Sequence, residues 1–173
     1  MSVDEHREAA KVSVLEFALV TVSDTRTEKT DEGGDVLRNL VEQAGHRVAS
    51  REIVRDEAEA IRAAVAVALA LPAVDAVLVT GGTGFSPRDV TLEAVSPLFE
   101  REIVGFGELF RMLSFAEIGA AAMLSRATAG LASGRAIFLL PGSPAALDLA
   151  LTRLVLPELA HLLAQARRSP ERL

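Results

Sequence analysis

Three polar loops carry most of the side chains that could do chemistry in this chain of 173 residues. They are residues 23–26 (SDTR), 81–84 (GGTG) and 141–144 (PGSP). Each loop follows an apolar run that is typical of a buried strand. Ligands of open parallel sheets bind at the carboxyl ends of the strands, so we expect the loops to meet at one edge and form one site.

The glycine loop is the strongest candidate for binding an anion. Gly81, Gly82, Thr83 and Gly84 leave space for a ligand, and their amides could form an anion nest beside the dipole of the next helix. The loop is neither a P-loop, which needs a lysine, nor a dinucleotide fingerprint. A strand-to-helix turn that requires positive φ explains the same residues, and the pattern alone does not separate the two interpretations.

Two aspartates near the same edge have a similar ambiguity. Asp56 and Asp89 each precede a predicted helix and could cap it. Alternatively, their carboxylates face the loop ligand and hold Mg²⁺ against phosphate groups. The motif around Asp89 alone favours the cap, yet two aspartates beside a phosphate nest also match a magnesium site.

A serine nucleophile is not expected in the PGSP loop. Ser143 could donate to a ligand, although Pro144 at the first position of a helix explains the turn equally well. No histidine is placed to activate a serine. We expect solvated or structural roles for all three histidines, which are His6, His46 and His161.

The segment between the second and third loops is harder to interpret. Residues 105–111 (GFGELFR) are unusual for a helix start, and their two glycines suggest close approach by a ligand or a neighbouring subunit. Phe106 and Phe110 are more typical of core or interface packing. Ser125 and Arg126 could contact a ligand, whereas a solvated arginine is the commoner outcome.

Alternating strands and helices must position these loops. Strands are expected at residues 15–22, 46–54, 76–80 and 136–140, and helices at 36–44, 57–71, 91–99 and 145–166. Residues 100–123 should hold a short strand and one or two helices. This order predicts an α/β fold with a mostly parallel sheet and helices on both faces. We expect one domain at residues 15–166, with an arm at 1–14 and a frayed tail at 167–173.

Composition narrows the classes of function. The net charge is −6 and both Trp and Tyr are absent, which argues against binding DNA or RNA. The absence of Cys excludes disulfides and thiol nucleophiles. The first 14 residues do not resemble a signal peptide, and the longest apolar run, residues 63–70, is too short to span a bilayer. We therefore expect a cytoplasmic protein without membrane or nucleic-acid partners.

Five short motifs in one order resemble the MoaB/Mog family of molybdenum cofactor biosynthesis. They are TGGTG at residues 80–84, PRDVT at 87–91, GFGE at 105–108, SRA at 125–127 and LPGSP at 140–144. Each motif is weak alone, but five in register are specific. The resemblance covers roughly residues 15–163 and is closer to the MoaB branch.

The resemblance implies a three-layer α/β/α molybdopterin-binding fold and a homotrimer or homohexamer. Active members resemble molybdopterin adenylyltransferases, which use Mg²⁺ and ATP to place AMP on the terminal phosphate of molybdopterin and release pyrophosphate. Their two essential carboxylates match Asp56 and Asp89, as catalytic groups and metal ligands. The glycine loop would cradle phosphate. The other residues expected to bind the pterin or the nucleotide are Ser23, Asp24, Glu108, Ser125, Pro141, Gly142 and Ser143.

Other functions fit the same resemblance. Some MoaB members lack one or both carboxylates and are thought inactive, so a non-catalytic oligomer that holds molybdopterin is the main alternative. The retained Asp56 and Asp89 favour activity and shift our interpretation of both toward the site. Molybdate-inserting domains and competence-damage proteins share similar loops but usually carry additional domains. A purely structural interaction protein would bind neither pterin nor nucleotide.

Overall fold

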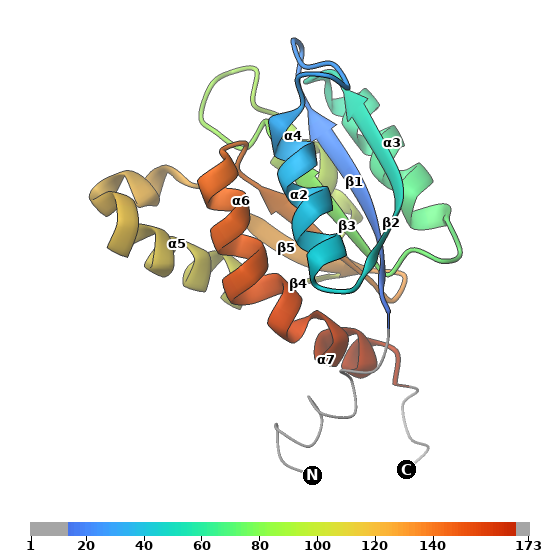
Figure 1. Cartoon of the computed structure of the whole chain (residues 1–173). Coiled ribbons are helices and arrows are strands. Elements are labelled where there is room, and N and C mark those ends of the chain that lie inside the picture. Colours follow the sequence, from blue (N-terminus) through green and yellow to red (C-terminus); the bar gives the residue numbers. More distant parts are fainter. Residues whose placement is uncertain (1–13, 169–173) are drawn as a thin grey trace.

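A six-stranded sheet of order β2-β1-β3-β6-β5-β4 forms the centre of the computed structural model, which describes residues 14–168 (Figure 1). The neighbours β2, β1, β3 and β6 are parallel, whereas β5 pairs antiparallel with both β6 and β4. The mostly parallel sheet is therefore confirmed. The strands are β1 Glu16–Val22, β2 Arg47–Val54, β3 Ala76–Thr80, β4 Arg101–Glu102, β5 Thr128–Ala132 and β6 Arg135–Leu140.

The helices form a layer on each face of this sheet, and Figure 1 shows α2 and α6 in front of it. No helix among residues 14–168 is long and apolar enough to cross a membrane. The helices are α2 Glu32–Gln43, α3 Ala58–Ala70, α4 Thr91–Val95, α5 Val104–Ile118, α6 Pro144–Ala150 and α7 Leu156–Ala166, with short 3₁₀ helices η1 Ser96–Leu98 and η2 Gly119–Leu124 and a π-helical turn η3 Leu151–Val155.

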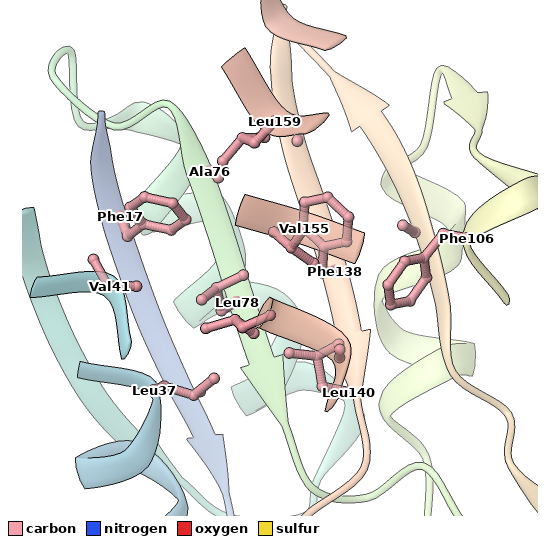
Figure 2. Close-up of a cluster of buried hydrophobic side chains, with 14 of the residues drawn as sticks. Phe17, Leu37, Val41, Ala76, Leu78, Phe106, Phe138, Leu140, Val155 and Leu159 are labelled. Atoms are coloured by element: carbon pink, nitrogen blue, oxygen red, sulfur yellow. The ribbon is translucent and has the colours of Figure 1, made fainter. Parts of the chain in front are cut away.

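Each face of the sheet has its own hydrophobic core, because successive side chains of a strand point to opposite faces. Phe17, Leu78 and Leu140 pack with residues of α2, α5, α6 and α7 on one face (Figure 2). On the other face, Val20 and Val77 pack with residues of α3 and α4. Burial on both sides explains why the central strands are nearly continuous apolar runs.

Helix α2 begins earlier than the sequence predicts, because a buried aspartate caps it. Residues 32–35, which precede the helix predicted at 36–44, form its first turn. Asp31 is 1% exposed and accepts hydrogen bonds from the Gly34 amide at 3.0 Å and the Thr21 hydroxyl at 2.9 Å. Arg51 donates to the same carboxylate at 2.7 Å. This network offsets the low helix propensity of the two glycines.

Two further predictions were incomplete. The helix predicted at residues 145–166 contains the π-helical turn η3, directly before Pro157 at the start of α7. Proline has no N–H to donate to the preceding turn, which disfavours regular α-helical hydrogen bonding there. Strand β5 was missed because Ala and Gly have low strand propensity. Its Gly130 is required by packing, since a Cβ there would overlap the Phe99 ring.

The termini are only partly described. The predicted arm at residues 1–14 falls almost entirely on residues 1–13, which lie outside the described residues, as do residues 169–173 of the predicted tail. Arg167, the first residue of that tail, donates to Asp75 Oδ1 at 2.7 Å and to the Gly134 carbonyl at 3.0 Å.

Candidate functional site

The structure brings the three predicted loops together at the carboxyl ends of β1, β3 and β6. Residues 81–84 and 141–143 line a pocket of about 470 Å³, called here the main pocket. Ser23, from the first loop, lines an adjoining side pocket of about 230 Å³. Gly81 and Gly142 line both pockets, so the two spaces are neighbours at one edge of the sheet.

The glycine loop has the backbone geometry of a tight turn. Gly81 and Gly82 have φ values of 98° and 62°, which side chains other than glycine rarely adopt. Thr91 fixes this turn, because its hydroxyl donates to the Gly81 carbonyl at 2.8 Å and its amide donates to the Gly82 carbonyl at 3.1 Å. The loop is thus a tight strand-to-helix turn, and it is also a wall of the main pocket.

Neither aspartate caps the helix that follows it. The N-terminal cap positions of α3 and α4 are Glu57 and Val90, and neither makes a side-chain capping bond. Asp89 instead accepts a hydrogen bond from the Ser86 amide at 2.8 Å and lines the main pocket. The cap interpretation, which the motif around Asp89 favoured, is therefore wrong for both residues.

Both carboxylates lie against the glycine loop. A Cβ built on Gly82 would be 2.9 Å from Asp56 Oδ1, and one built on Gly84 would be 2.7 Å from Asp89 Oδ2. Asp56 also accepts a long hydrogen bond of 3.5 Å from the Val90 amide. Only glycine leaves space for the two carboxylates at this distance from the loop backbone.

Several carboxylates lie close together beside the glycine loop. Burial raises the pKa of Asp56 above its usual value, and the nearby charges of Asp89 and Asp24 raise it further against the opposing effect of the Val90 amide. Asp24 accepts a hydrogen bond from the Asp56 amide at 3.2 Å and pairs with Arg88. The hydrogen bond from Arg88 is the main reason that the pKa of Asp24 is lowered.

This arrangement fits a magnesium ion only together with a phosphate ligand. Within residues 14–168, no group of three or more Asp, Glu or His side chains is arranged to hold a metal. Mg²⁺ commonly uses one or two carboxylates, with substrate phosphates and water completing its shell. Asp56 and Asp89 supply such a pair of carboxylates, and the excess negative charge around Asp56 is what a bound cation would neutralise.

Most of the remaining predicted site residues line the main pocket, but one does not. Ser125, Pro141, Gly142 and Ser143 line the main pocket. Ser143 also caps α6, because its hydroxyl accepts a hydrogen bond from the Ala146 amide at 3.4 Å. Glu108 is exposed on α5 and lines neither the main nor the side pocket.

One wall of the main pocket was not predicted. Phe110, Ser114 and Ile118 line it from one side of α5, and Ala121, Ala122 and Leu124 continue it along η2. The spacing of four residues in α5 is the signal that could have indicated a common helical face. This spacing was not recognised, because the sequence did not define the helix boundaries within residues 100–123.

The two glycines before this wall differ in their surroundings, because a Cβ on Gly105 would meet open space. A Cβ on Gly107 would be 2.8 Å from the Ala127 carbonyl, so the close neighbour is a segment of the same chain, where we expected a ligand or another subunit. Phe106 stacks on Phe110 at 6.1 Å and meets Phe138 edge-on at 5.2 Å. The prediction of core packing for both phenylalanines is confirmed.

The histidines that the structure describes have structural contacts. His46 accepts a hydrogen bond from the Leu15 amide at 3.3 Å and lies 5.7 Å from the Phe17 ring. His161 contacts Gln165 at 2.8 Å on α7. Neither lines the main pocket, and His6 lies outside the described residues.

Known proteins resemble the chain over nearly its full length. Residues 18–161 match a family described as a probable molybdopterin binding domain. Molybdenum cofactor biosynthesis protein B of Bacillus subtilis is 48% identical over 97% of this chain and 99% of its own. A crystal structure of a molybdenum cofactor biosynthesis protein B is 50% identical, with a TM-score of 0.88 over 91% of this chain and 98% of that one.

A more distant structure has the same fold. The tungsten cofactor synthesizing protein MoaB of Pyrococcus furiosus is 34% identical, with a TM-score of 0.82 over 90% of this chain and 99% of its own. The expected three-layer architecture is therefore shared with solved structures. The motifs and the fold both point to the same family.

Proposed function

The chain belongs to the family of molybdopterin-binding domains that includes the MoaB proteins, and we propose that it adenylylates molybdopterin in molybdenum cofactor biosynthesis. The observation that supports this most is the placement of Asp56 and Asp89. Both carboxylates lie against the glycine loop of the pocket and cap no helix. Such carboxylates are available for binding a cation and its phosphates.

The proposed reaction joins two substrates, ATP and molybdopterin. An oxygen of the pterin phosphate attacks the α-phosphorus of ATP, the bond to the bridging oxygen breaks, and pyrophosphate leaves with the electron pair. Because the attacking oxygen is already anionic, no nucleophile of the protein is needed. The task of the chain is to align the groups and stabilise charge.

The loops have distinct parts in this scheme. The amides of residues 81–84 contact phosphate oxygens, while Ser125 and Ser143 orient a substrate in the main pocket. The side pocket beside Ser23 receives the second substrate. Asp56 and Asp89 would hold Mg²⁺, which supplies charge neutralisation on the transferred and leaving phosphates.

A turnover assay tests this proposal. Purified chain is mixed with molybdopterin, ATP and MgCl₂, and adenylylated molybdopterin is measured. Asp56→Asn and Asp89→Asn should each lower kcat by at least about a hundredfold, the range of a lost electrostatic contact in a transition state. Glu42→Gln, an exposed carboxylate on α2 outside both pockets, is the matched control and should remain active.

The other outcomes also have clear meanings. Full activity of a folded Asp89→Asn variant would refute the metal role of that residue. Absence of product from a folded parent chain that still binds molybdopterin would replace the proposal with a non-catalytic, pterin-binding protein. Molybdate-loaded pterin as the product would indicate a different enzyme class on this fold.

We also propose that the chain forms a homotrimer or homohexamer. Large apolar side chains are exposed along α5 and η2, where they form what we call the α5 apolar surface: Val104, Leu109, Met112, Phe115, Ile118, Met123 and Leu124, each between 47% and 75% exposed. A group of this kind is typical of a protein interface. Sedimentation should give several chains per particle, and Phe115→Glu should reduce that number.

A further inference from the structure

Arg126 reaches from the segment between η2 and β5 to the loop that carries Asp89. Its Nε donates to the Gly84 carbonyl at 2.9 Å and, less closely, to the Thr83 carbonyl at 3.4 Å. Its Nη2 donates to the carbonyl of Asp89 at 2.9 Å. One guanidinium therefore binds both ends of the segment 84–89, which runs from the last residue of the glycine loop to Asp89.

The same segment is closed from within by Asp89. Its carboxylate accepts from the Ser86 amide at 2.8 Å, and its amide donates to the Ser86 carbonyl at 2.9 Å. These bonds fix Asp89 relative to Ser86 but do not attach the segment to the sheet. Arg126 supplies such an attachment, because it belongs to the chain that leads directly into β5.

Arg126 is itself held firmly. Its Nη1 pairs with Glu93 at 2.5 Å, its side chain is only 20% exposed, and its guanidinium lies 5.3 Å from the centre of the Phe85 ring. The hydrogen bond from Arg126 is the main cause of the lowered pKa of Glu93, so the pair is ionic. All three guanidinium nitrogens thus have partners within the protein.

The backbone on either side of Arg126 is anchored in turn to α5. Arg111 Nη1 donates to the Ala127 carbonyl at 3.2 Å and to the Ser125 carbonyl at 3.4 Å. Gly107 permits this close approach, as described above. The support of the Asp89 loop therefore runs from α5 through Arg111 and Arg126.

We propose that Arg126 is a positioning residue that fixes Asp89 and the glycine loop, and that it is not a phosphate ligand. The kinetic part of this inference rests on the function proposed above. A planar fork with donors at fixed angles is needed to reach carbonyls at residues 84 and 89 together. A lysine ammonium keeps the charge but cannot reproduce this fork.

Kinetic measurements on Arg126→Lys and Arg126→Gln separate positioning from phosphate binding. Both variants should lower kcat about a hundredfold, the effect of a small misplacement of catalytic groups, and change KM for ATP less than threefold. Arg135→Lys is the matched control. Arg135 also donates to carbonyls, those of Val74 at 3.0 Å and Leu71 at 3.4 Å, but near the amino ends of β3 and β6. The Arg135→Lys variant should leave kcat unchanged.

Hydrogen exchange of the amides in residues 82–90 provides a readout without substrate. Both Arg126 variants should exchange faster there, whereas Arg135→Lys should not, and this arm remains valid even if the parent lacks adenylyl transfer. Unchanged exchange in a folded Arg126→Gln protein would overturn the proposal. So would an Arg126→Lys protein that keeps its kcat and shows a raised KM, because that pattern identifies a phosphate ligand.

Discussion

Replacement of Asp31 by alanine should destabilise the fold strongly, because this buried carboxylate joins α2 to two strands. The substitution removes the acceptor for the Gly34 amide, the Thr21 hydroxyl and Arg51. Loss of a helix cap costs about 0.5–2 kcal/mol. Breaking a buried ion pair on one side costs about 3–5 kcal/mol, so we expect a total near 4 kcal/mol, allowing for overlap of the two effects.

Urea unfolding followed by circular dichroism measures this loss at a fixed protein concentration. The matched control is Asp35→Ala, which removes the other carboxylate partner of Arg51, also at 2.7 Å but with a side chain 45% exposed. An exposed pair contributes about 0–1 kcal/mol. If the two alanine variants differed by less than about 1 kcal/mol, the reasoning from burial would be refuted.

Acid should reduce the difference between Asp31→Ala and the parent chain. Burial alone would raise the pKa of Asp31, but hydrogen bonds from Arg51, Gly34 and Thr21 outweigh burial and lower it below its usual value of 3.8. A lowered pKa means that the ionised carboxylate stabilises the fold above that value. The contribution is lost as the pH falls through the lowered pKa.

Three further predictions concern the site and the end of the chain. Gly82→Ala should lower the free energy of unfolding by at least about 1–2 kcal/mol, because its φ is positive and because the new Cβ would overlap Thr91 Oγ1. It should also lower turnover more than tenfold. Gly45→Ala, with φ of 82° but open space, should affect stability alone. Asp56→Asn should raise the melting temperature at pH 7, because a raised pKa means that parent stability falls as the pH rises through it; a lower melting temperature would contradict this. Arg167→Ala should reduce stability by at most about 1 kcal/mol. Asp75→Ala should do more in the same unfolding assay, because it also removes the acceptor for the Glu16 amide at 2.9 Å.

The strands buried on both faces were the most predictable elements. Residues 76–80 are apolar except for Thr80, and the predicted bounds are those of β3. Strand β2 has no fully buried residue and lies at the edge of the sheet. Helix α2 was placed less well, because local propensity disfavours Gly33 and Gly34 and only the buried bonds of Asp31 extend the helix over them.

The site was predictable where it depends on strand ends and obscure where it depends on long-range contacts. The meeting of residues 81–84 with 141–143 follows from the parallel sheet. By contrast, the function of Arg126 depends on Asp89, which is 37 positions earlier in the chain. Local sequence patterns do not connect residues so far apart, so the sequence alone favoured a solvated arginine over a contact with the Asp89 loop.

The position of β6 has a consequence for synthesis of the chain. Strand β6 follows the other five strands in the sequence, yet it lies in the interior of the sheet beside β3. A ribosome that has translated only residues 1–134 has released β1, β2 and β3 without the neighbour that covers the second edge of β3. An uncovered apolar edge pairs readily with other chains. We therefore expect chaperones to bind nascent chains of this length. Release should follow once residues 135–140 have left the exit tunnel, just before residues 141–146 complete the main pocket.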